Sequence, residues 1–113
     1  MEKINLQDKF ALRVAELVKT QWDEIRIHYE NAEIDGVARE VFTSSFVING
    51  SKQELELPLE ALDLLEDLKK HKPQGQSEEW TWLEFRISNT GKYKFEYMYD
   101  MPPLIAEQIK YSK

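Results

Sequence analysis

The side chains with the clearest potential for chemistry are two glutamates on a predicted β-hairpin. In the register that a three-residue turn implies, Glu84 and Glu96 lie opposite each other, as the two carboxylates of a general acid–base site would. Arg86 then meets Lys94 on the same face of the hairpin. Diagonal contacts between the acidic and the basic pair neutralise both, so this pattern favours a surface charge ladder over an active site.

The two histidines give no further support for catalysis. His28 is expected on the polar side of a strand, and His71 near the end of a helix, where the helix dipole accounts for it. Neither has a second ligand at the spacing of a metal site. The chain has no cysteine, which excludes disulfides, thiolate metal sites and a cysteine nucleophile. No nucleotide-binding, hydrolase or metalloprotease motif occurs, so we expect neither enzymatic activity nor a cofactor.

Length and composition predict one packed domain over residues 1–113. Hydrophobic residues amount to 42% and aromatic residues to 12% of the chain, which is typical of a globular core. No apolar run approaches the roughly 18 residues that would span a membrane. The first residues lack the apolar core of a signal peptide, so we expect a cytoplasmic protein.

Apolar spacing and turn signals predict the element order α-β-β-β-α-β-β-α. Asn49-Gly50 is the strongest two-residue hairpin signal in the chain. The predicted helices cover 6–19, 59–71 and 104–111, and the predicted strands cover 23–33, 37–49, 51–57, 79–88 and 92–100. Tight turns make consecutive strands antiparallel. The simplest fold is α+β, with a single antiparallel sheet of about five strands and the helices packed mainly on one face.

The most informative stretch is the last hairpin, from Glu79 to Asp100. Strict alternation places Trp80 and Trp82 on the face away from the predicted core, with Trp82 beside Met98 and Trp80 beside Asp100. Two indoles and a thioether would form an apolar patch of the kind found at protein interfaces. Alternatively, the first or the final helix covers this face and makes it a second core.

The charge of the chain points to the kind of partner. The net charge is −6, which disfavours direct binding of nucleic acid, because phosphate contacts need clustered Lys and Arg. Between Asp23 and Asp67 there are 12 acidic residues against 3 basic ones. This acidic middle either attracts a basic partner or serves as a solvated surface. Acids early and lysines late in the second predicted helix also match its dipole.

Three short motifs carry a resemblance to a known family. Trp22 precedes the first predicted strand, Trp80-Thr81-Trp82-Leu83-Glu84-Phe85 lies in the fourth, and Gly91-Lys92-Tyr93 opens a fifth that ends in Tyr97-Met98-Tyr99-Asp100. Together with the order of elements, they resemble the YezG-like family of bacterial antitoxins. Those proteins are small acidic immunity factors. The resemblance implies an immunity protein that binds and neutralises a polymorphic or contact-dependent toxin, with a nuclease as the expected kind, by blocking its active site or substrate surface.

The expected partner is therefore a cognate toxin domain that is basic, rather than nucleic acid or a membrane. Charge and exposed aromatic side chains predict the contact residues Glu60, Asp63, Asp67, Trp80, Trp82 and Asp100. One alternative is an adaptor or homo-oligomerisation module, such as a homodimer, in which the tryptophan patch pairs with its own copy. A second is an enzyme with a pocket around Glu84 or another buried acid.

Overall fold

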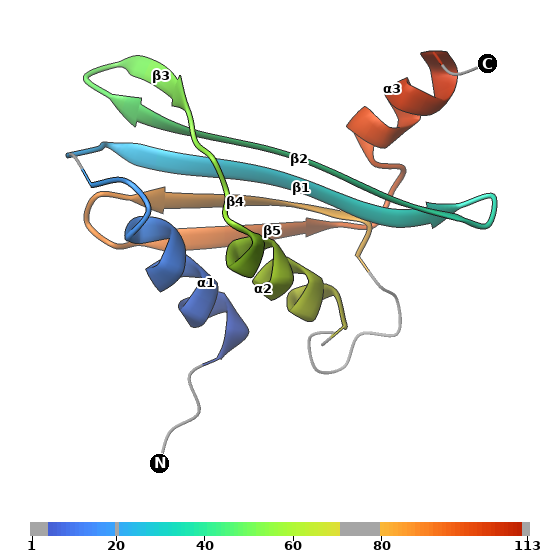
Figure 1. Cartoon of the computed structure of the whole chain (residues 1–113), viewed down its shortest axis with the longest axis horizontal. Helices are drawn as coiled ribbons and strands as arrows, with labels where there is room; N and C mark the ends of the chain where they lie inside the picture. Colours follow the sequence, from blue (N-terminus) through green and yellow to red (C-terminus); the bar gives the residue numbers. More distant parts are fainter. Residues whose placement is uncertain (1–4, 20, 71–79, 112–113) are drawn as a thin grey trace.

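The computed structural model describes residues 5–19, 21–70 and 80–111. Within these residues the elements are α1 (Leu6–Ala15), β1 (Glu24–Ile34), β2 (Val37–Ile48), β3 (Ser51–Glu54), α2 (Leu59–Lys70), β4 (Trp82–Ser88), β5 (Tyr93–Met98) and α3 (Pro103–Tyr111). The strands form one antiparallel sheet in the order β3-β2-β1-β4-β5 (Figure 1). The predicted α+β fold and its element order are confirmed. No helix in this part of the chain is long and apolar enough to cross a membrane.

Two tight turns set the register of the first three strands. Asp35 and Gly36 join β1 to β2 with φ of 54° and 77°, and Asn49 and Gly50 join β2 to β3 with φ of 49° and 79°. Positive φ at both central residues is the type I′ geometry, whose twist matches that of the flanking strands. The register of the last hairpin, with Trp82 opposite Met98, is also as predicted.

Several element ends differ from the predictions because tertiary packing decides them. α1 begins after Asn5, whose side chain accepts a hydrogen bond from the Asp8 N–H at 2.8 Å, and it ends at Ala15 rather than at Lys19. β3 ends at Glu54 rather than at Leu57. The chain leaves the sheet there to reach α2, and Leu57 enters the core with only 8% of its surface exposed.

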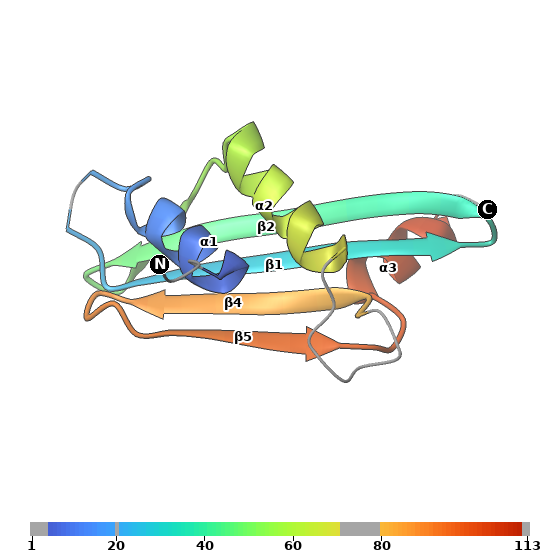
Figure 2. The same ribbon diagram turned by 90° about the horizontal axis from the view of Figure 1, so that it is seen from below.

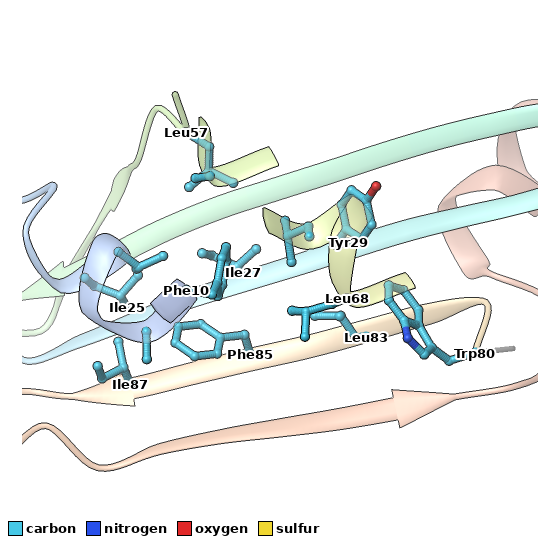
Figure 3. Close-up of a cluster of buried hydrophobic side chains, with 14 residues drawn as sticks. Phe10, Ile25, Ile27, Tyr29, Leu57, Leu68, Trp80, Leu83, Phe85 and Ile87 are labelled. Carbon is cyan, nitrogen blue, oxygen red and sulfur yellow. The ribbon is translucent and has the colours of Figure 1, made fainter. Parts of the chain in front are cut away.

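The main core lies between one face of the sheet and the helices α1 and α2 (Figure 3). It contains Phe10, Ala11, Val14, Ile25, Ile27, Tyr29, Leu57, Ala61, Leu65, Leu68, Trp80, Leu83, Phe85 and Ile87. The Phe10 ring meets the Phe85 ring edge-on, with centroids 5.0 Å apart. Burial of this aliphatic and aromatic surface is the main force that holds the helices on the sheet.

The third helix covers part of the opposite face. Figure 2 shows α1 and α2 in front of the sheet and α3 behind it, toward the end where β1 turns into β2. Ile105 of α3 is buried, and so is Pro102, the residue that precedes this helix. Two of the three helices share one face, as predicted, and α3 makes a small second core on the other side, one of the two alternatives that the sequence left open.

Candidate functional site

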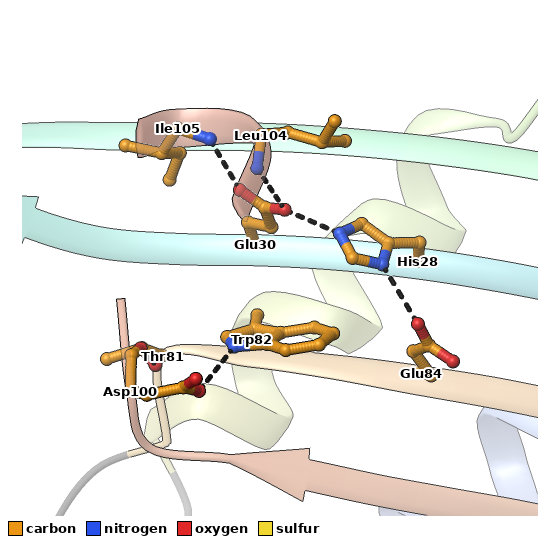
Figure 4. A network of polar contacts seen from close by, with 8 residues as sticks. All are labelled: His28, Glu30, Thr81, Trp82, Glu84, Asp100, Leu104 and Ile105. Carbon is orange, nitrogen blue, oxygen red and sulfur yellow. Dashed lines mark hydrogen bonds and ion pairs between the residues drawn. The ribbon is translucent and has the colours of Figure 1, made fainter. Parts of the chain in front are cut away.

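The six predicted contact residues do not form one surface. Glu60, Asp63 and Asp67 belong to α2 and lie on the side of the sheet that carries α1. Trp82 and Asp100 lie on the opposite side, near the start of α3 (Figure 4). The sheet therefore separates the acidic residues from the tryptophan, and a single partner contacts both groups only by reaching around an edge.

Trp80 is a core residue, so the prediction that it shares an exposed patch with Trp82 is wrong. The Thr81 N–H donates to the Met98 carbonyl at 2.8 Å, while Trp82 is the register partner of Met98. Two consecutive residues thus oppose one, which is a β-bulge and interrupts the alternation of side chains. Trp80 turns to the face of α1 and α2, where 1% of its surface is exposed and its ring lies 5.7 Å from that of Tyr97.

Trp82 and Asp100 contact each other instead. The Trp82 Nε1–H donates to Asp100 Oδ1 at 2.9 Å, and the indole ring packs against the His28 ring with centroids 5.1 Å apart (Figure 4). The Thr81 hydroxyl donates to the Asp100 carbonyl and fixes the chain just before α3. Both polar groups are used within the protein, so this pair stabilises the approach to α3 and offers a partner one half-buried ring.

Glu30 is fully buried on the same side of the sheet and holds the first turn of α3. Its carboxylate accepts hydrogen bonds from the backbone N–H groups of Leu104 at 2.9 Å and Ile105 at 2.7 Å, and it is also bonded to His28 Nε2. An anion at a helix N-terminus satisfies free N–H groups and the helix dipole. His28 lies on the polar side of β1, as predicted, and it is half-buried in this network.

The residues around His28 could suggest acid–base chemistry, but each of them is engaged. His28 Nδ1 lies 3.4 Å from Glu84, and both Glu30 oxygens are occupied by α3 and His28. Glu84 and Glu96 face each other as predicted, and Glu96 pairs with Lys94 of its own strand at 3.4 Å. Among the described residues, no group of three or more acidic or histidine side chains has the arrangement of a metal site. His71 lies outside the described residues.

The charged residues of α2 fall on three sides of the helix. Ala61, Leu65 and Leu68 form its buried stripe. Helical spacing places Glu60 and Asp67 on the flank beside α1, where Glu60 pairs with Arg13. Asp63 points outward, and Glu66 lies on the flank toward β2. The three predicted acids of α2 therefore do not share one face.

Glu66 meets a second acid across the space between α2 and β2. The pKa of Glu66 is raised, first by burial, then by the negative charges of Glu40 and Asp63, and by a hydrogen bond between the carboxyl groups of Glu66 and Glu40. Lys70 opposes this shift through its charge. We call Glu40, Asp63 and Glu66 the acidic cluster. Glu40 and Asp63 are exposed and Glu66 is half-buried.

Glu40 is held in place from the core. The Tyr29 hydroxyl donates to Glu40 Oε2, and the Asn31 amide donates to the Tyr29 hydroxyl at 2.9 Å. The pKa of Tyr29 is raised above its usual value, first by burial and then by its hydrogen bond to Glu40. The phenol thus stays protonated and keeps the Glu40 carboxylate in a fixed position.

A groove with both polar and apolar lining residues begins beside the acidic cluster. Phe42 follows Glu40 by two residues on the same face of β2, and 38% of its surface is exposed. The groove has a volume of about 650 Å³ and runs between β2 and the segment after β3, lined by Phe42, Thr43, Ser44, Glu54, Leu55, Glu56 and Leu57. Exposed apolar surface bordered by acids is typical of a protein-binding site.

Sequence reasoning found Asp63 and missed Glu40 and Glu66. Helical spacing alone could have placed Glu66 on a different side of α2 from Glu60 and Asp67. Its contact with Glu40 could not be predicted, because it depends on where α2 crosses the sheet. The sequence indicates the role of Glu30 only indirectly. Two prolines stand at the start of α3 and no nearby side chain can cap it, so its free N–H groups need an acceptor from another part of the chain. Comparison with protein-family models and with curated proteins finds no match for this chain.

Proposed function

We propose that this protein is a non-catalytic inhibitor of the immunity or antitoxin kind, which binds a cationic toxin domain through the acidic cluster. The observation that carries this proposal is the placement of Glu40, Asp63 and Glu66 side by side at the surface, next to the exposed ring of Phe42. Adjacent carboxylates repel one another in the free protein. A Lys or Arg side chain inserted among them removes that repulsion and forms charge-assisted hydrogen bonds.

This arrangement suits a toxin that acts on nucleic acid. The substrate surface of a nuclease must be basic to hold phosphates. An acidic surface competes for the same contacts, and long-range attraction raises the rate of association. The exposed ring of Phe42 would supply buried apolar contact, which slows dissociation. The resemblance to YezG-like antitoxins supports the same function independently of the charge argument.

The alternatives have less support. Self-pairing through a tryptophan patch needs two exposed indoles, and only the half-buried ring of Trp82 remains. The enzyme alternative was a pocket around Glu84 or another buried acid, whereas Glu84 contacts His28 and the buried Glu30 is closed off by α3.

The proposal is tested with the protein encoded next to this one in its genome. We expect that protein to be toxic when expressed alone, harmless when co-expressed with this chain, and bound with an affinity that falls as salt rises. Replacing all three acids of the cluster (Glu40→Gln, Asp63→Asn, Glu66→Gln) should weaken binding by at least about tenfold, since close charge pairs at interfaces contribute about 1.5 kcal/mol or more.

The matched control replaces three exposed acids elsewhere (Glu16→Gln, Glu96→Gln, Glu107→Gln), which gives the same change in net charge. It should change the affinity by less than about threefold, because such charges act only at long range. Equal losses in the two triple variants would show that net charge, and not the acidic cluster, attracts the partner. Unchanged affinity in both would overturn the proposal.

A further inference from the structure

The outer edge of β2 is unpaired over most of its length. β3 pairs only with Ser45–Ile48, and one further bond joins the Leu55 N–H to the Ser44 carbonyl at 3.1 Å. From Val37 to Thr43, no strand in the described part of the chain pairs with this side of β2. Figure 1 shows β2 extending well beyond β3 toward its turn with β1.

The turn geometry identifies the backbone groups that point outward along this edge. In a two-residue hairpin the residues flanking the turn exchange both hydrogen bonds, so Val37 bonds toward β1. The bonding direction alternates along a strand. Ala38, Glu40 and Phe42 therefore direct their N–H and C=O groups away from β1, in the same sense as Ser44, whose carbonyl receives Leu55. All three of these residues are exposed.

The two edges of the sheet are protected differently. On β5 the exposed Lys94 lies on the strand itself, and side chains from the start of α1 contact its tyrosines: Gln7 bonds to Tyr97, and Asp8 to Tyr93. Lysine and covering contacts are the usual means of blocking an edge strand. The unpaired part of β2 carries no lysine and carries Glu40 instead. This edge is open, and its two charges lie on opposite faces of the sheet, Glu40 on the face of α2 and Arg39 on the other.

We propose that the unpaired edge of β2 receives an extended, cationic segment of the partner as an additional strand of the sheet. This inference rests on the proposed function and specifies how the partner binds. The outward groups of Ala38, Glu40 and Phe42 supply the backbone hydrogen bonds. Cationic side chains of the added strand meet the acidic cluster on the face of α2, and its apolar side chains lie beside Val41 on the opposite face.

A second copy of this chain is a poorer occupant of the same edge. When two copies pair antiparallel at this edge, the residues whose backbone groups point away from β1 must lie opposite one another. A register centred on Glu40 faces Glu40 with its own copy, and one centred on Arg39 faces two arginines, both of which destabilise the pairing. A register centred on Val41 pairs Glu40 with Phe42, but it cannot extend to pair Ala38 with Ser44, whose carbonyl is already bonded to Leu55. A cationic strand avoids the like-charge pairings and places its charges opposite Glu40.

The experiment uses two short capped peptides of alternating Lys and Val. They carry the same charge, but one is N-methylated at every second amide on its pairing side, so it cannot form ladder hydrogen bonds. With isotope-labelled protein at low salt, we expect the unmethylated peptide to shift the amide resonances of Ala38, Glu40 and Phe42 and to slow their hydrogen exchange. The methylated peptide should bind at least about tenfold more weakly, a loss of about 1.4 kcal/mol.

A backbone variant provides the second measurement. Ala38→Pro removes an outward N–H that has no partner in the sheet. It should therefore weaken binding of the unmethylated peptide, while Ala38→Ser should leave that binding unchanged. Equal binding of the two peptides would overturn strand addition and leave charge-based recognition standing. If neither peptide binds at low salt, both strand addition and the proposed attraction of a cationic partner are overturned. The peptide comparison uses unaltered protein and stays decisive if Ala38→Pro does not fold.

Discussion

The buried carboxylate of Glu30 offers a sharp test of how α3 is held on the sheet. No part of its surface is exposed, and it accepts two backbone N–H groups of α3 as well as bonding to His28. Hydrogen bonds to a charged group contribute about 1.5–3 kcal/mol each. Removing one partner of a buried charged network costs roughly 3–5 kcal/mol, because the groups that bonded to it are left buried without that bond.

We therefore expect Glu30→Ala to destabilise the docked form of α3 by about 3–5 kcal/mol. Glu30→Gln keeps one acceptor oxygen and should cost about 1–2 kcal/mol, or roughly 4–8 °C in the melting temperature of a domain of this size. Thermal and urea unfolding measure the loss. Hydrogen exchange of the α3 amides shows whether the helix detaches while the rest of the sheet stays folded.

Glu96→Gln is the matched control, because Glu96 lies on the same side of the sheet and is exposed. Its pair with Lys94 is a surface pair, so its loss should cost less than about 1 kcal/mol. If Glu30→Ala and Glu96→Gln have the same small effect, and the α3 amides exchange as slowly as before, Glu30 does not hold α3 and the reasoning is refuted.

Three further predictions concern the core and the titrating groups. Trp80→Ala should cost about 3–5 kcal/mol in unfolding experiments, because the ring is buried; a loss of partner affinity without a loss of stability would contradict its place in the core. The hydrogen bond to Asp8 raises the pKa of Tyr93 to about 12, so the stability it provides should be present below about pH 10 and disappear as pH rises toward 12; this dependence should become weaker in Tyr93→Phe, where the raised pKa values of Tyr29 and Tyr97 remain, as measured by urea unfolding across that range, and an unchanged dependence would contradict the role of this bond. The raised pKa of Glu66 means that the folded state keeps a proton longer than the unfolded state, so stability should fall as pH rises above the usual glutamate pKa; Glu66→Gln should flatten that dependence and leave stability at neutral pH equal or higher, and a steeper dependence would be inconsistent with the acidic cluster.

Much of the fold was predictable because local signals carry it. The turns at Asp35-Gly36 and Asn49-Gly50 need positive φ, and only a few residue types adopt it readily. Alternating apolar residues then fixed which face of β1 and β4 enters the core. Element order, strand pairing within hairpins and the register of the last hairpin all followed from such short-range patterns.

The candidate site was harder to predict because it depends on contacts between distant segments. Alternation placed Trp80 outside, but the bulge at Thr81 and Trp82 reverses its direction, and no residue type marks that bulge in the sequence. The meeting of Glu40 with Glu66 depends on the crossing of α2 over the sheet. The placement of α3 on the far face depends on Glu30. The alternation of side chains along β1 predicts only that Glu30 lies on the polar face of the strand.

The central claim is that a cationic partner binds at the acidic cluster and the open edge of β2. The most direct measurement is the hydrogen-exchange footprint of this protein in complex with the protein encoded next to it. The account predicts protection concentrated at Ala38, Glu40 and Phe42 and along the exposed side of α2, with little change around Trp82 and α3. Protection centred on Trp82 and α3, with β2 and α2 unchanged, would contradict it.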